Sequence, residues 1–138
     1  MKKNIKVTAV VLCLVLVGLC LAFVSCDKKD DIEGVYTGVF TVKYAEDTSE
    51  CKGETTLKLQ DGKYSCTGNP NRVPAGGSGS YTISDGKITF FDENFWTADF
   101  DWNLILSGEY DYTFAGDNLM IYRGNHGIVT HKYELKKQ

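Results

Sequence analysis

Both tryptophans of the chain lie in one short segment, residues 92–103, which also carries four carboxylates. Large aromatic side chains on a loop can hold sugars or apolar molecules by stacking, so this segment is a candidate ligand-binding loop. Its candidate contact residues are Phe95, Trp96, Phe100 and Trp102. The alternative is that these rings close one end of the fold or pack beneath the loop, as large rings commonly do.

The same segment contains the first half of a calcium-binding loop. Asp99, Asp101 and Asn103 place oxygen atoms at alternate positions, as such a loop requires. Leu104 then stands where the turn needs a glycine, and Tyr110 stands where a bidentate glutamate is needed. The second half of the pattern therefore fails, and we expect no metal site.

No other residues form a recognisable catalytic pattern. His126 lies between Asn125 and Gly127 in a loop-like stretch, His131 lies in an alternating run, and neither has metal-ligand spacing to a cysteine. Ser78 lies among glycines, but a nucleophile elbow would need a further glycine and a helix after it. We therefore predict a protein that is not an enzyme and has no cofactor.

The N-terminus has the layout of an export signal. Three lysines precede an apolar run from Val7 to Val24, and the small residue Ser25 precedes Cys26. The motif Phe23-Val24-Ser25-Cys26 resembles the lipobox of bacterial lipoproteins, which implies cleavage before Cys26 and acylation of that cysteine with fatty acids such as palmitate. An uncleaved anchor and plain secretion are the alternatives, because an apolar run of about 18 residues is also near the length of a spanning helix.

A charged stretch follows the cysteine at residues 27–31. Such a stretch has too little apolar surface to fold and is expected to be a solvated tether. It also resembles the surface-export signal of Bacteroides-group lipoproteins, which implies the outer membrane and display at the cell surface. The chain is thus divided into a signal peptide at 1–25, a lipidated cysteine with its tether at 26–32, and one domain at 33–138.

The charge of the exported part excludes two classes of partner. Loss of three lysines with the signal changes the formal charge from −3 to about −6. An acidic chain without a basic stripe is not expected to bind nucleic acid or anionic headgroups, which both need clustered lysine and arginine. The predicted contact with the membrane is therefore the lipid anchor.

Cys51 and Cys66 remain after Cys26, in a compartment where disulfides persist. The hairpin pattern described next places Cys66 opposite Leu57, about six residues or ~20 Å of extended strand from Cys51. A bridge between them would need a folded-back loop. A disulfide and two separate thiols both stay open.

The exported chain alternates apolar and polar residues between tight turns. Asp61-Gly62 and Asp85-Gly86 supply the two positive-φ residues of a type I′ turn, and Gly116-Asp117 closes a third hairpin. Strands at 34–44 and 128–136 bracket these hairpins. The residues placed on the apolar face are Leu57, Leu59, Tyr64, Cys66, Tyr81, Ile83, Ile88, Phe90, Tyr112, Phe114, Leu119, Ile121, Val129, His131, Tyr133 and Leu135.

Roughly eight or nine sequential strands with one apolar face each predict an all-β fold, a small antiparallel up-and-down barrel. Closure of the barrel also removes the exposed edges of an open sheet. A two-sheet sandwich is the alternative, but hairpin follows hairpin with no sign of long crossovers.

Residues 32–135 resemble the lipocalin-like domains of Bacteroides-group lipoproteins. The resemblance rests on the opening Ile32–Gly38, on Gly79-Ser80-Tyr81 and on the run Leu106–Phe114. The chain has Tyr36 two residues after Gly34, where lipocalins have tryptophan, and Arg123 is the candidate for the arginine that packs over that position.

The resemblance implies a binding module for a small apolar or amphipathic ligand, held between strands lined by Tyr64, Tyr81, Phe90 and Tyr112. The same residues could instead fill a narrow barrel. The alternative function is an accessory protein that binds an envelope protein or a glycan through the loop around Trp96 and Trp102.

Overall fold

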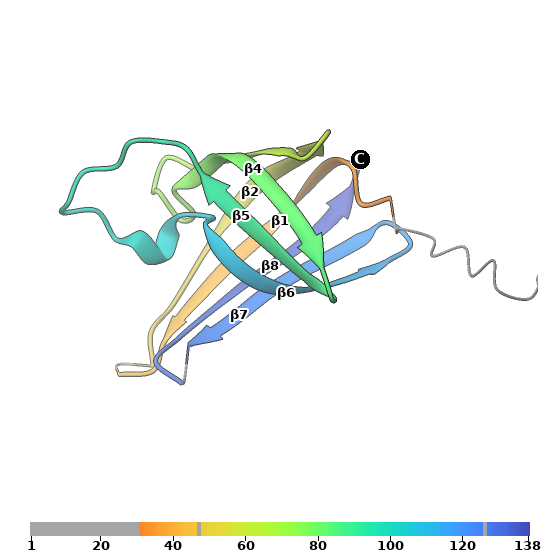
Figure 1. The fold of residues 1–138 in the computed structure, drawn as a ribbon. Helices are drawn as coiled ribbons and strands as arrows, with labels where there is room; N and C mark the ends of the chain where they lie inside the picture. Colours follow the sequence, from red (N-terminus) through yellow and green to blue (C-terminus); the bar gives the residue numbers. More distant parts are fainter. Residues whose placement is uncertain (1–30, 47, 126) are drawn as a thin grey trace, which may run out of the picture. The chain divides into compact units, whose positions relative to one another are not determined.

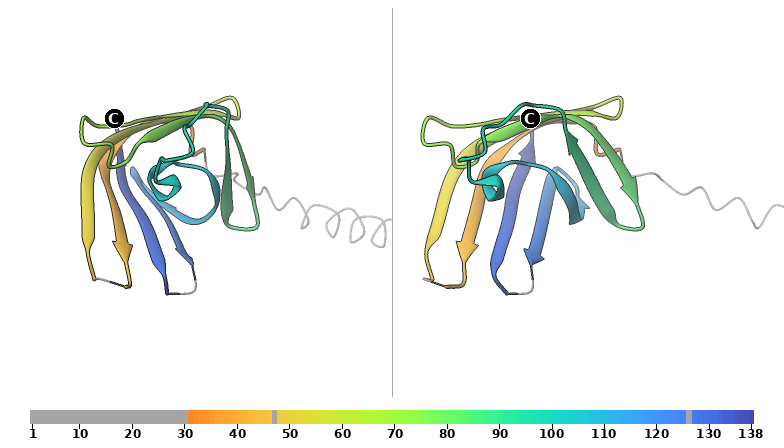
Figure 2. Two further views of the ribbon diagram at one scale, coloured as in Figure 1. Left: turned by 90° about the vertical axis from the view of Figure 1, so that its left-hand side faces the viewer. Right: turned by 60° about the vertical axis from the view of Figure 1, so that its left-hand side comes forward.

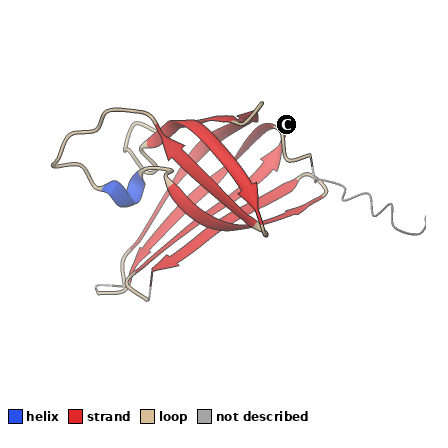
Figure 3. Cartoon of the chain, in the orientation of Figure 1, coloured by secondary structure: helices blue, strands red, loops and turns tan. Residues whose placement is uncertain are grey.

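The computed structural model describes residues 31–46, 48–125 and 127–138. Antiparallel strands form a closed barrel in chain order, and the last strand pairs with the first (Figures 1 and 3). The strands are β1 (Gly34–Tyr44), β2 (Glu50–Gln60), β3 (Lys63–Thr67), β4 (Gly76–Ser84), β5 (Lys87–Asp92), β6 (Gly108–Ala115), β7 (Asn118–Asn125) and β8 (Val129–Lys137), with a short 3-10 turn η2 (Trp102–Leu104). The predicted all-β up-and-down barrel is confirmed.

Two hairpin turns have the backbone that their sequences predict. The φ angles are 51° at Asp61 and 73° at Gly62, and 53° at Asp85 and 75° at Gly86. These left-handed pairs match the twist of the strands that they join. They fix the registers of β2 with β3 and of β4 with β5, and a slip of one residue would turn the apolar face to solvent.

The third predicted hairpin is also present. Tyr112 pairs with Ile121, and Phe114 pairs with Leu119, across the turn between β6 and β7. Gly116 has a φ of 61° in that turn. All three registers that the sequence predicts are therefore observed.

The two ends of the barrel are different. The tight turns, the start of β1 and the end of β8 lie together at one end, which we call the turn end (Figure 1). The longer connections lie at the other end, which we call the loop end. The connection from β5 to β6, residues 93–107, projects from it on the left of Figure 1.

The wall of the barrel is uneven at the loop end. Figure 2 shows the β1–β2 and β7–β8 hairpins extending together beyond the remaining strands. Regular pairing of β2 with β3 covers only Leu57–Gln60, and pairing of β7 with β6 stops at Tyr122. In the described residues, the loop-end halves of β2 and β7 are therefore paired on one side only.

Inward side chains from all the strands fill the interior. Those that are essentially inaccessible to solvent include Tyr36, Phe40, Leu57, Leu59, Ile88, Phe90, Tyr110, Leu119, Ile121 and Tyr133. Their rings are in contact, with centroids 4.6 Å apart for Phe40 and Tyr133 and 4.8 Å for Tyr64 and Phe90. Burial of each such side chain contributes roughly 1.5–3 kcal/mol, so this core is the main source of stability.

The turn end is closed by the residues that precede β1. Ile32 is 2% exposed and belongs to the same core, and the Tyr36 hydroxyl donates to its carbonyl at 2.6 Å. Ile32, which the sequence places at the end of the tether, therefore packs with the barrel.

Cys51 and Cys66 are both free, the first exposed and the second buried. Cys51 pairs with Val42 and Cys66 with Leu57, because β2 runs on as an extended strand between these two levels. The Cys66 sulfur instead lies 3.2 Å from the Thr55 hydroxyl. The disulfide considered from the sequence is therefore not formed.

Candidate binding site at the loop end

The connection 93–107 is fixed at its start by one carboxylate. Asp92 Oδ1 accepts hydrogen bonds from the Ser78 backbone at 3.0 Å and from the Asn94 amide at 2.6 Å. Its Oδ2 accepts from the Trp96 indole N–H at 2.5 Å. With a longer hydrogen bond from the Tyr64 hydroxyl at 3.5 Å, one side chain thus satisfies four donors and holds the first tryptophan in place.

A second carboxylate fixes the middle of the connection. Asp101 accepts from the Tyr44 hydroxyl at 2.7 Å and, as the cap of η2, from the Asn103 backbone at 2.9 Å. Partial burial raises the pKa of Asp101, but the hydrogen bonds from Tyr44 and Asn103 outweigh it, so the pKa lies below its usual value. The carboxylate is therefore ionised at neutral pH.

The end of the connection closes the barrel with aliphatic side chains. Ile105 and Leu106 are buried, and Leu104 packs against the core. The Leu106 backbone donates to the Gly76 carbonyl at 2.9 Å, and Ala75 donates to the Leu104 carbonyl at 2.8 Å. No buried role was predicted for Leu104, Ile105 and Leu106. Three consecutive apolar residues after a polar stretch are nevertheless a signal of burial that the sequence provides.

The four aromatic residues predicted to contact a ligand fall into two pairs. Trp96 and Phe100 are half-buried with ring centroids 5.0 Å apart, and the Arg72 guanidinium lies 5.7 Å from the Phe100 ring. Phe95 is 97% exposed and Trp102 is 59% exposed. The first pair therefore holds the loop, and the second pair presents its rings to solvent.

The interior residues predicted to hold a ligand face inward, as expected, but they pack against one another. The Tyr64 hydroxyl donates to the Leu106 carbonyl at 2.6 Å, and its burial raises its pKa well above the usual value. Tyr81 and Phe90 pair across β4 and β5 with ring centroids 6.4 Å apart. Tyr112 is half-buried and packs against the same core from β6.

Three further interior residues carry polar atoms that the sequence analysis gave no role. Tyr110 is 1%, His131 is 2% and Tyr133 is 0% exposed. The Tyr133 hydroxyl has no hydrogen-bond partner among the described residues, whereas the Ser107 backbone serves Tyr110 and the Arg123 and Asn103 backbones serve His131. We call these three residues the interior polar cluster.

The surroundings of the interior polar cluster keep His131 neutral. Burial, followed by the charge of Arg123, lowers the pKa of His131 to about 4. The Arg123 guanidinium lies 4.3 Å from the Tyr110 ring centroid and donates to the Ser107 carbonyl at 2.8 Å. Alternation along β8 places His131 inside, but the sequence alone does not reveal which groups surround it.

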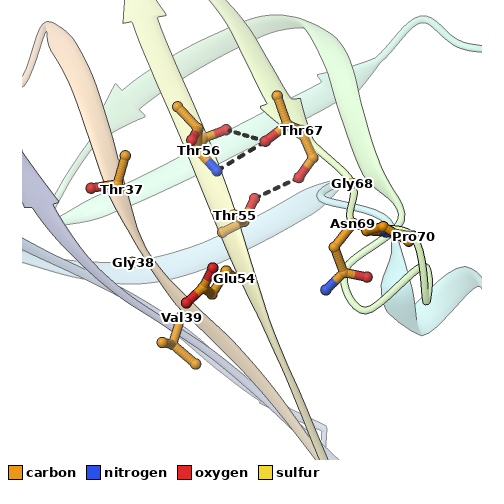
Figure 4. Close-up of a pocket in the computed structure, with 10 residues that line it drawn as sticks. All are labelled: Thr37, Gly38, Val39, Glu54, Thr55, Thr56, Thr67, Gly68, Asn69 and Pro70. Carbon is orange, nitrogen blue, oxygen red and sulfur yellow. Dashed lines mark hydrogen bonds between the residues drawn. The ribbon is translucent and has the colours of Figure 1, made fainter.

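A groove on the outside of the barrel is a weaker candidate (Figure 4). It runs over β1 and β2 to the connection after β3, and its lining residues include Thr37, Glu54, Thr56, Thr67 and Asn69. The threonine hydroxyls are already engaged: Thr67 Oγ1 accepts from the Thr56 backbone at 3.0 Å, and Thr37 Oγ1 accepts from Gln138 at 2.6 Å. The groove also has no aromatic ring against which a ligand could stack.

The part of the chain that the structure describes contains neither a metal-binding cluster nor a membrane-spanning helix. No group of three or more His, Cys, Asp or Glu side chains there could hold a metal ion. No helix within these residues has the length and apolar character needed to cross a membrane. The predicted lipidation site Cys26 and the loop residue His126 lie outside the described residues.

Comparison of the chain with protein-family models found no matching family. Comparisons with curated proteins and with solved structures found no match either. The function is therefore inferred from the geometry of the chain itself.

Proposed function

We propose that this protein is a lipid-anchored binding module of the lipocalin-like type, held at the outer membrane through Cys26, that recognises a neutral glycan of the cell envelope. The observation that carries the proposal is the exposure of Phe95 and Trp102 on a loop whose start, middle and end are fixed to the barrel. Binding residues are found disproportionately on loops that a rigid scaffold positions.

The chemistry of the loop suits a sugar. Aromatic faces stack on the apolar faces of sugar rings, and ionised carboxylates accept hydrogen bonds from hydroxyls. A hydrogen bond from Thr97 is the main cause that lowers the pKa of Asp99, and Asp101 is also ionised, as described above. Because these carboxylates would repel an acidic glycan, the proposed ligand is a neutral one.

The loop is ordered before any ligand arrives. The bonds from Trp96 to Asp92 and from Tyr44 to Asp101 restrict the backbone on either side of the exposed rings. Binding then loses less conformational entropy than it would with a free loop, so a small contact area gives useful affinity.

The barrel also gives the loop a direction. Ile32 is packed at the turn end, and residues 93–107 lie at the loop end. If Cys26 is acylated, the six intervening peptide links span at most about 20 Å, so the turn end stays near the membrane. The aromatic loop then faces away from the membrane, where envelope glycans are accessible.

A small apolar ligand inside the barrel has less support. The candidate residues Tyr64, Tyr81, Phe90 and Tyr112 contact one another or the surrounding core in the described structure. A ligand between them would have to replace these contacts. Such a barrel is more simply interpreted as filled by its own side chains.

The test is binding of the purified full-length lipoprotein, in detergent, to an array of neutral and acidic bacterial glycans. We expect binding to a neutral glycan that is lost in the Phe95→Ala/Trp102→Ala double variant. Tyr122→Ala is the matched control, because Tyr122 is an exposed aromatic residue on β7.

Two results would contradict this proposal. Glycan binding that persists in the double variant would show that the exposed rings are not the site. Capture of an envelope protein in place of any glycan, with the same dependence on Phe95 and Trp102, would replace the glycan by a protein partner.

A further inference from the structure

One edge of the barrel wall is open at the loop end. The β1–β2 hairpin extends beyond the neighbouring strands there (Figure 2), and β3 pairs with β2 only at Leu57–Gln60. Further towards the loop end, the Thr56 N–H donates to Thr67 Oγ1 at 3.0 Å. Beyond that, no strand of the described residues pairs with the free side of Glu50–Glu54, which we call the open edge. It begins after Thr48, whose left-handed φ of 54° interrupts the extended backbone.

The backbone groups of Glu50, Lys52 and Glu54 point outwards from the open edge. Tyr44 donates to the Ser49 carbonyl at 3.1 Å, so these two residues form a hydrogen-bonded pair across β1 and β2. In an antiparallel ladder such pairs alternate with pairs that are not hydrogen-bonded. Ser49 and every second residue after it therefore bond to β1, and the residues between them direct their N–H and C=O groups away from it. Such a row of groups is a template for another strand.

The charges along the open edge favour a second copy of the same edge as its partner. The Glu50 carboxylate lies 2.6 Å from the Lys43 ammonium and 2.5 Å from that of Lys52. Two such edges can pair antiparallel about a two-fold axis, so that each surface contacts its own copy. If Cys51 lies opposite Cys51 of the second copy, each Glu50 lies opposite a Lys52. Opposite charges directly across two strands stabilise the pairing, and the backbone groups at both levels match.

Other self-pairings of the open edge are less favourable. A pairing centred on Lys52 places the two Lys52 side chains opposite each other, and one centred on Glu50 does the same with two carboxylates. Like charges directly opposite are destabilising. A pairing centred on Gly53 would need the backbone of Thr56, which is already bonded to β3. The pairing centred on Cys51 is therefore the one that the edge favours.

We propose that the open edge of β2 is the contact of a two-fold symmetric homodimer, in which Glu50–Lys52 pairs antiparallel with the same residues of a second copy. Cys51 is exposed and its thiol is free. In this pairing the two Cys51 residues form the pair that is not hydrogen-bonded, with Cα atoms about 4.5 Å apart. A disulfide spans about 4.4–6.8 Å between Cα atoms, so these thiols can report the pairing.

The pairing also determines how the two copies lie. The paired strands run in opposite directions, so the loop ends of the two copies meet and their turn ends point apart. The contact contains no residue of the connection 93–107, and the homodimer therefore does not depend on the function proposed above. It is short, so we expect a weak dimer.

Oxidative crosslinking of the full-length protein in detergent tests the proposal. Each Cys51–Cys51 bond takes two electrons and two protons from two thiols, and one added glutathione disulfide becomes two glutathione molecules. We expect a covalent dimer on a non-reducing gel that Cys51→Ser abolishes. Lys52→Glu places a carboxylate opposite Glu50 of the second copy and should lower the yield several-fold. The matched control is Lys132→Glu on β8, which changes the net charge equally and should leave the yield unchanged.

A mixture of two variants tests the pairing itself. Lys52→Glu alone and Glu50→Lys alone each place like charges opposite each other, whereas a pair made of one copy of each has only unlike charges opposite. The yield should therefore recover in an equal mixture. A mixture that crosslinks no better than either variant alone would overturn the proposed pairing.

Two further results would reject the homodimer. One is the absence of a covalent dimer in the natural protein. The other is an equal yield for the natural protein, Lys52→Glu and Lys132→Glu, because it would mean that exposed thiols react through random collisions.

Discussion

The turn end and the loop end of the barrel are built by different means. At the turn end, two-residue turns and the buried Ile32 close the structure with short-range contacts. At the loop end, long connections close it, and they carry exposed rings at Phe95 and Trp102. The turn end and the core therefore provide stability, and the exposed rings at the loop end are the feature on which the proposed function rests.

The largest effect expected from this division is at the turn end. Ile32→Ala should lower the free energy of unfolding by about 2–5 kcal/mol, because it leaves a cavity under a buried side chain. Chemical denaturation measures this change. The control is Val35→Ala, an exposed residue at the same end. Equal, small effects of the two variants would mean that Ile32 does not close the barrel.

The second-largest effect is a loss of stability in acid. It arises at His131, which lies in the loop-end half of the interior and pairs with Val42 on β1 and Arg123 on β7. The pKa of His131 is lowered to about 4 in the fold from its ordinary 6.5. The unfolded chain therefore binds more protons between these values, and stability is full above pH 6.5 and falls by roughly 2–3 kcal/mol as the pH drops towards 4.

The measurement is the free energy of unfolding from pH 7.5 to 4.5 for the natural protein and for His131→Phe. The variant should lose the part of the slope between about pH 6.5 and 5, where carboxylates contribute little. An identical slope in both proteins would show that His131 is not the group responsible.

A smaller effect is expected where the loop is attached. Asp92→Ala removes the acceptor of four hydrogen bonds, including that from Trp96, and should cost about 1–3 kcal/mol. Hydrogen exchange should become faster in residues 93–103 and stay unchanged in the turns at the other end. Glu93→Ala is the control, since its ion pair with Lys63 is exposed and contributes little. Uniformly faster exchange would mean that the two ends are not independent.

The smallest effect should come from the exposed rings themselves. Phe95→Ala and Trp102→Ala should each change the free energy of unfolding by less than about 0.5 kcal/mol, because neither ring is part of the core. Denaturant titration checks this. A loss of several kcal/mol would show that the rings support the fold and would remove the reason to assign them to binding.

The sequence predicts the barrel well because its signals are local. Asp61-Gly62 and Asp85-Gly86 specify turn type, and the alternation of residues such as Tyr64 and Cys66 specifies which side faces inward. Each signal involves residues close in the chain, so no knowledge of the tertiary structure is needed to use it.

The site is less predictable because its members are brought together by the fold. Trp96 and Trp102 are alike in sequence, and only the hydrogen bond that Trp96 donates to Asp92 reveals which ring is held by the fold. The interior polar cluster joins Tyr110 to His131 across an intervening strand, and such a contact cannot be seen in a sequence.

Closure of the barrel joins the two most distant parts of the domain. β1 pairs with β8 along its length, and Gln138 bonds to Thr37 across 101 positions of sequence. Contacts of this range form late and slow the search for the native state. Because synthesis delivers the N-terminus first, this barrel cannot be sealed until its last strand has been made, so folding must follow completion of the chain instead of accompanying it.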